Sequence, residues 1–158
     1  MKKALVLMIT NLILVLLQVS FFGELVAPIF VPNLVFGFAF AIMFIDLSET
    51  SYMSAFFGGI LLDLLTFGII GVSSLTFVGF LFLFSFVRRY ISKSVYSSSL
   101  GVVVTQFLYV WFVLGFETVG FGKILTNSFI TLAVALLFQV VLGNFIDYLG
   151  RSGYKISE

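Results

Sequence analysis

The chain has 158 residues, and neither cysteine nor histidine is among them. Without cysteine there are no disulfides and no thiol chemistry, and without both residue types the usual zinc, iron and copper sites are excluded. Histidine is also the side chain most often used as a general base near neutral pH. The sequence further lacks a nucleotide-binding glycine loop, a nucleophile elbow, an HExxH motif and paired carboxylates. We therefore expect no enzyme, no metal site and no cofactor.

Charge is scarce as well. Eight Lys and Arg and seven Asp and Glu make up 9% of the residues, whereas 61% are hydrophobic and the mean hydropathy is +1.25. A soluble domain has about 25% charged residues, and fifteen charges are too few to cover the surface of this chain. The net charge of +1 provides no basic stripe for nucleic acid. The pattern predicts an all-α integral membrane protein surrounded by lipid.

Six apolar segments are separated by charges, prolines and glycines. A bilayer span needs about 20 apolar residues, so the length allows at most six spans with short loops. Lys2 and Lys3 precede an apolar run as in a signal peptide, but the run is long and no small-x-small site follows it, so we expect an uncleaved first helix. We predict a single polytopic membrane domain over 1–158, with approximate spans at 4–23, 33–46, 52–66, 69–87, 99–118 and 124–147.

The distribution of lysine and arginine predicts the topology. If the N-terminus is inside, the outer loops hold Lys123 alone, and the cytoplasmic segments hold Lys2, Lys3, Arg88, Arg89, Lys93, Arg151 and Lys155. Cytoplasmic loops carry an excess of these residues in membrane proteins. We therefore expect a multi-pass protein of the bacterial inner membrane with both termini in the cytoplasm.

Asp63 is the only charged residue between Glu49 and Arg88. It precedes a predicted tight turn at 66–68, and Gly59, Asp63 and Thr66 have the spacing of one helix face. A glycine on that face lets a neighbouring helix approach closely. A carboxylate inside a membrane needs a compensating partner. Free backbone amides near the start of the next helix, at 71–74, are suitable donors. Asp63 could pin this hairpin, shape a binding surface for another membrane protein, or belong to an ion pathway, which the lack of other intramembrane ionisable groups disfavours.

Amide and hydroxyl side chains are scattered through the other segments. They suit hydrogen bonds between helices, and a polar pocket for a small ligand is the alternative. The set comprises Asn11, Gln18, Gln106, Asn127, Thr131 and Gln139.

The order of these features resembles the MreD family of rod shape-determining proteins. The resemblance covers most of the chain, and its informative part is 32–89: PNL at the second span, the block GGILLDLLTFGIIGVSSLTFVGF, and the RR that ends the fourth span. The positions that match the family pattern are Pro32, Gly59, Asp63, Leu64, Gly68 and Gly71, and Asn33 stands where relatives usually have aspartate.

The resemblance implies a non-catalytic inner-membrane scaffold of the cell-elongation machinery, which positions side-wall peptidoglycan synthesis and maintains rod shape. It also implies the partners: an MreC-like bitopic membrane protein, an MreB-like actin filament, and the RodA glycosyltransferase with its transpeptidase. The family is similar in size and fold to the substrate-binding subunits of energy-coupling-factor vitamin transporters, which are the alternative function. Their alanine-x-x-x-alanine docking pattern is absent from the first segment, where Ala4 is the only alanine.

Overall fold

The computed structural model describes residues 2–25, 31–45, 48–66, 69–88, 95–114 and 121–151. This part of the chain is helical and contains no strand, which confirms the all-α class. Each predicted apolar segment overlaps one helical segment, and positions 46 and 115–118 of two predicted segments lie outside the described residues. The elements are α1 (Lys2–Leu16), continuing directly into a π-helix η1 (Leu17–Phe22) and α2 (Gly23–Leu25), then α3 (Leu34–Phe44), α4 (Ser48–Leu65), α5 (Val72–Arg88), α6 (Val95–Leu114) and α8 (Phe121–Arg151).

The helix boundaries differ from the predicted segments at several places. Helix α4 begins at Ser48 rather than 52, so it includes polar residues that precede the apolar segment. Glu49 lies in its first turn, where a negative charge interacts favourably with the helix dipole. Helix α5 begins at Val72 rather than 69, since residues 69–71 belong to the turn. Helix α8 has 31 residues and is longer than the predicted 124–147 at both ends.

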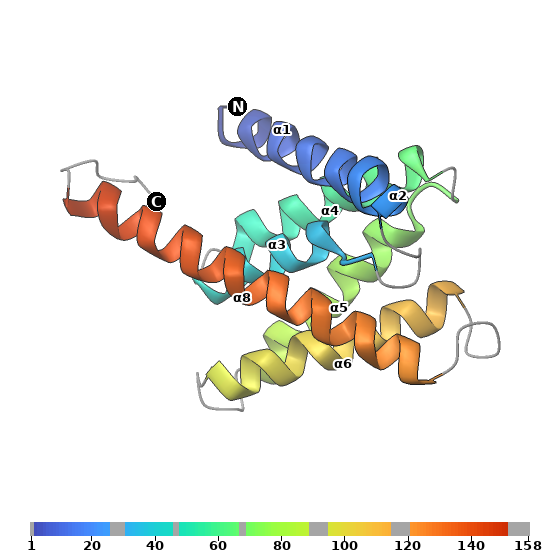
Figure 1. Cartoon of the computed structure of the whole chain (residues 1–158). Coiled ribbons are helices and arrows are strands. Elements are labelled where there is room, and N and C mark those ends of the chain that lie inside the picture. Colours follow the sequence, from blue (N-terminus) through green and yellow to red (C-terminus); the bar gives the residue numbers. More distant parts are fainter. Residues whose placement is uncertain are drawn as a thin grey trace.

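Helix α3 is the centre of the bundle. Its residues from Leu34 to Met43 are all buried, which fits a helix that is apolar on every side. It packs against α8, α4 and α1, while α4 also packs against α5, and α6 against α8. In Figure 1 the start of α1 and the end of α8 lie on the left, and α2, the α4–α5 connection and the start of α8 lie on the right. We call this right-hand side the hairpin end.

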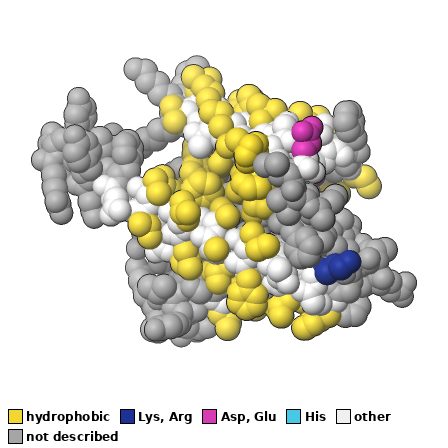
Figure 2. All heavy atoms as spheres, in the orientation of Figure 1, with side chains coloured by type: hydrophobic (Ala, Val, Ile, Leu, Met, Phe, Trp, Pro, Cys, Tyr) yellow, Lys and Arg dark blue, Asp and Glu magenta, His cyan; other side chains and the backbone are white. Residues whose placement is uncertain are grey.

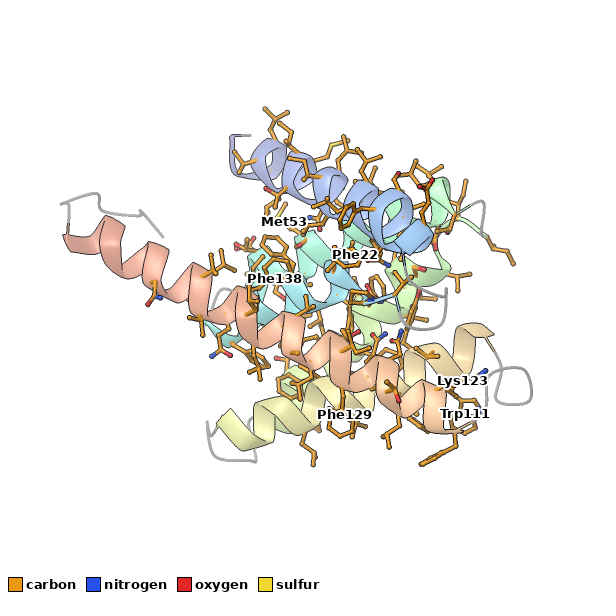
Figure 3. All side chains as sticks on the ribbon, in the orientation of Figure 1. Phe22, Met53, Trp111, Lys123, Phe129 and Phe138 are labelled. Carbon is orange, nitrogen blue, oxygen red and sulfur yellow. The ribbon has the colours of Figure 1, made fainter. Side chains whose placement is uncertain are left out.

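The core between α3 and α5 is aromatic. The ring of Phe36 lies 4.7 Å from that of Phe40 and 5.1 Å from that of Phe77, and Phe40 lies 5.2 Å from Phe84. On the other side of α3, Phe138 of α8 points toward it and places its ring 5.6 Å from Phe38 (Figure 3). These contacts hold α3 between α5 and α8.

The outer surface of the bundle is apolar. Large hydrophobic side chains are exposed on α1, α4, α5, α6 and α8, and Figure 2 shows them spread over the visible face. Two stretches, Ala4–Phe22 and Phe121–Asn144, are long and apolar enough to cross a membrane, as judged by length and composition. Shorter apolar helices are Leu34–Phe44, Val72–Phe86 and Leu100–Trp111.

Candidate functional site

Asp63 lies near the end of α4 and is only 4% exposed. Its Oδ2 accepts hydrogen bonds from the backbone amides of Gly71 at 2.7 Å and Ser73 at 3.1 Å, and its Oδ1 accepts from Ser73 at 3.3 Å. The prediction that Asp63 binds the amides at the start of the next helix is therefore confirmed. We call Gly59, Asp63, Gly71, Ser73 and Ser74 the hairpin clasp.

The clasp forms because the first amides of α5 have no partner within their own helix. A carboxylate near the start of a helix also interacts favourably with the helix dipole, and hydrogen bonds to a charged acceptor are stronger than neutral ones. Gly71 turns the chain with φ +98°, a conformation that costs glycine little because it has no Cβ. Both carboxylate oxygens of Asp63 are thus engaged in holding the turn.

Gly59 allows α4 and α5 to approach closely at the clasp. A Cβ on Gly59 would fall directly on the backbone of Ser73 and Ser74, where it has no room. This confirms the prediction that a glycine on the face of Asp63 admits a neighbouring helix. Thr66 was expected on the same face, but it is exposed beyond the end of α4, and its hydroxyl donates to the carbonyl of Leu62 at 2.7 Å.

The clasp is joined to α6 through Tyr109. The Tyr109 hydroxyl lies 3.2 Å from the Ser73 hydroxyl, and its ring lies 4.8 Å from that of Phe77. The sequence prediction did not include Tyr109. A usable signal was present, because a tyrosine inside an apolar helix usually finds a hydrogen-bond partner.

The other predicted site residues do not all lie in the clasp. Pro32 and Asn33 are buried at the start of α3, where the carbonyl of Pro32 accepts from the amide of Leu34 at 3.0 Å. Leu64 is 49% exposed on the outside of α4. Gly68 lies outside the described residues. The structure therefore brings Gly59, Asp63 and Gly71 together and places Pro32 and Asn33 at a second polar cluster.

This second cluster, which we call the α3 junction, consists of Gln18, residues 31–34, Gln106, Asn127 and Thr131. Asn33 is the N-cap of α3, with its Oδ1 accepting from the amide of Phe36 at 3.1 Å. The amide of Asn33 donates to Thr131 Oγ1 at 3.1 Å, and the amide of Leu34 donates to Gln18 Oε1 at 2.9 Å. Side chains of η1 and α8 thus bind the backbone at the start of α3.

Amide side chains extend the α3 junction to α6. Gln106 Nε2 donates to Asn127 Oδ1 at 2.9 Å, and Asn127 Nδ2 donates to the carbonyl of Val31 at 2.9 Å. The predicted hydrogen bonds between segments are confirmed at these residues. The oxygen Oε1 of Gln106 is buried and has no hydrogen-bond partner.

A third polar contact joins α1 to α4 and confirms the interhelical hydrogen bond expected of Asn11, although its partner Ser54 was not predicted. Asn11 Nδ2 donates to Ser54 Oγ at 3.0 Å, and a Cβ on Gly58 would press on the side chains of Asn11 and Val35. Ser51, Ser54 and Gly58 are spaced i, i+3, i+7, which places small residues on one face of α4. That spacing was the signal that could have identified this contact.

No group of three or more His, Asp or Glu side chains that could hold a metal ion occurs in the described ranges. The site is a closely packed hairpin whose turn is held by one carboxylate and whose outer side chains are apolar. Comparisons with family models, with curated proteins and with solved structures found no match for this chain.

Proposed function

We propose that the chain is a six-span protein of the bacterial inner membrane with both termini in the cytoplasm. The apolar surface and the two long helices support this. Three charged side chains of the described part support it too, because Glu24 lies exposed in α2, and Glu49 and Lys123 lie exposed near the starts of α4 and α8. Lys123 and Trp111 both lie at the hairpin end (Figure 3), and such residues are typical of membrane–water interfaces.

Within the membrane the proposed role is that of a non-catalytic scaffold of the cell-elongation machinery, as in the MreD family. Its proposed partners are an MreC-like bitopic protein, an MreB-like filament, and the RodA glycosyltransferase with its transpeptidase. The observation that carries the proposal is the clasp, since three of the positions that match the family pattern, Gly59, Asp63 and Gly71, meet in it.

The clasp presents a surface suited to docking. We define the hairpin tip as Leu64, Ile69, Ile70 and Leu75, which are all exposed, with Ile69 80% and Leu75 77% exposed. Because the clasp constrains the backbone beneath the tip, these side chains are held in a defined arrangement. A preorganised apolar surface loses less entropy on binding than a mobile one.

The test is affinity purification of the tagged full chain in mild detergent from cells that contain the elongation proteins. The wild-type chain should recover an MreC-like bitopic protein, and Asp63→Ala should remain in the membrane but recover about tenfold less of it if docking weakens by about 1.4 kcal/mol. Ser51→Ala is the matched control, because it removes a single internal hydrogen bond, to the carbonyl of Ala39, near the other end of α4.

Equal recovery by Asp63→Ala and wild type would show that docking does not depend on the clasp. Recovery of ATP-binding-cassette ATPases together with a vitamin would instead favour the alternative function, a substrate-binding subunit of an energy-coupling-factor transporter.

A further inference from the structure

The start of α3 is an unusual feature for the interior of a helical bundle. Helix α3 has 11 residues, about 16 Å, which is roughly half the hydrocarbon thickness of a bilayer. Its N-terminal residues Asn33 and Leu34 are 3% and 6% exposed. In several secondary transporters, half-helices that begin near the middle of the bilayer direct their free amides and the positive end of their dipole at the substrate.

Neutral side-chain oxygens occupy these amides in the structure. Gln18, Asn33 and Thr131 each supply one acceptor, and they come from η1, from the residue preceding α3, and from α8. Among the described residues that form the junction, none is charged. The junction therefore suits an uncharged polar group rather than an ion.

Gln106 gives an independent indication of a ligand. Its side chain is 1% exposed, and its Oε1 is a buried acceptor without a partner. The orientation of the amide is determined by its neighbours: Nε2 donates to Asn127 Oδ1, and Asn127 uses its own Nδ2 on the carbonyl of Val31. Rotating the Gln106 amide would place two acceptor oxygens against each other. A buried acceptor of this kind needs a donor.

The two sides of the junction differ in accessibility. On one side Phe36 begins the aromatic core with Phe40 and Phe77, which closes the way toward the opposite end of the bundle. On the other side lies Gln18, the one half-buried side chain among the polar groups. Gln18 lies in η1, and π-helical turns occur frequently at functional sites. The junction is therefore least covered at Gln18, on the side of the hairpin end.

We propose that the α3 junction binds a small uncharged hydroxyl compound, which donates a hydrogen bond to Gln106 Oε1. A hydroxyl group fits because it can donate to the free oxygen without bringing a charge to a junction whose described residues are all uncharged. The site is separate from the hairpin tip, and the proposal does not depend on the scaffold role.

The test uses glycerol as the probe and thermal unfolding of the purified full chain in detergent as the measurement. Specific binding raises the midpoint in proportion to the logarithm of 1 + [ligand]/Kd, so the curve flattens above Kd, whereas an excluded osmolyte raises it in proportion to its concentration. Wild type should give the logarithmic curve with glycerol and a linear rise with betaine, which has no hydroxyl group. Gln106→Leu should lose the logarithmic component, and Gln139→Leu, on α8 outside the junction, should keep it.

Gln106→Met serves as the second variant if Gln106→Leu does not fold. Native mass spectrometry of the protein extracted from membranes gives a second readout, since a co-purified neutral adduct should be present in wild type and absent in the Gln106 variant. A wild-type chain that shows neither the logarithmic response nor an adduct would overturn the proposal, as would equal responses of wild type and Gln106→Leu.

Discussion

At the scale of single residues, the hairpin depends on the absence of a side chain at Gly59 and on the carboxylate of Asp63. The absence of a Cβ on Gly59 lets α4 meet the backbone of Ser73 and Ser74. The Asp63 carboxylate then reaches the amides of Gly71 and Ser73. Each residue needs the other, since the carboxylate can bind those amides only where the two helices are in close contact.

Gly59→Ala should destabilise the protein by about 1–3 kcal/mol, because the new methyl group has no space and the helices must separate. Gly79→Ala on α5 is the matched control. A Cβ on Gly79 has nothing within 4 Å, so the variant should be unchanged or up to about 1 kcal/mol more stable through helix propensity. Thermal or denaturant unfolding in detergent measures both, and equal effects of the two variants would contradict the close approach.

At the scale of elements, α3 is held by its neighbours more than by its own sequence. It is buried along its length, and two of the amides at its start are satisfied by Gln18 of η1 and Thr131 of α8. An isolated helix of 11 residues is marginal in water. The helix therefore owes its stability to packing against α4 and α8 and to these hydrogen bonds.

Thr131→Val should cost about 1–3 kcal/mol of stability, because the isosteric change leaves the buried amide of Asn33 without an acceptor. Thr126→Val on the same helix is the control. Its hydroxyl donates to the carbonyl of Gly122 within α8 and is exposed, so the change should lie within about 0.5 kcal/mol. Unfolding measured for the two variants side by side distinguishes them, and similar losses would argue that Thr131 acts through helix propensity rather than through α3.

At the scale of the whole molecule, the helices alternate in direction, so the hairpin end collects α2, the α4–α5 turn and the start of α8 (Figure 1). The polar clasp and the α3 junction both lie toward this end, and the aromatic core lies beyond them. In the proposed topology the hairpin end faces outward, since Lys123 is the one basic residue assigned to that side.

Single cysteines introduced into this cysteine-free chain test the topology in intact cells. Phe30→Cys and Phe121→Cys should react with a membrane-impermeant thiol reagent, whereas Ser92→Cys should react only after permeabilisation. The expected pattern follows from the seven-to-one distribution of Lys and Arg between the two sides. Labelling of position 92 from outside would reverse the proposed orientation.

Sequence alone anticipated the helical class, the six helical segments and the Asp63 clasp. Apolar runs separated by charges and breakers mark helices, and an isolated carboxylate near a turn has few compensating donors other than the next amides. It did not anticipate Tyr109 as the contact of Ser73, nor Asn33 as a cap held by Thr131. These partners are 36 and 98 residues apart in the chain, and no local pattern encodes such pairings.

What the sequence by itself determined is the all-helical class and the approximate positions of the helices, because hydropathy and the rarity of charge act locally along the chain. Only the tertiary structure decided that α3 is buried on all sides, that the backbone facing Gly59 is that of Ser73 and Ser74, and that Gln106 keeps an unpaired oxygen. These properties depend on which helix faces meet, and that is set by side-chain shape across the whole bundle.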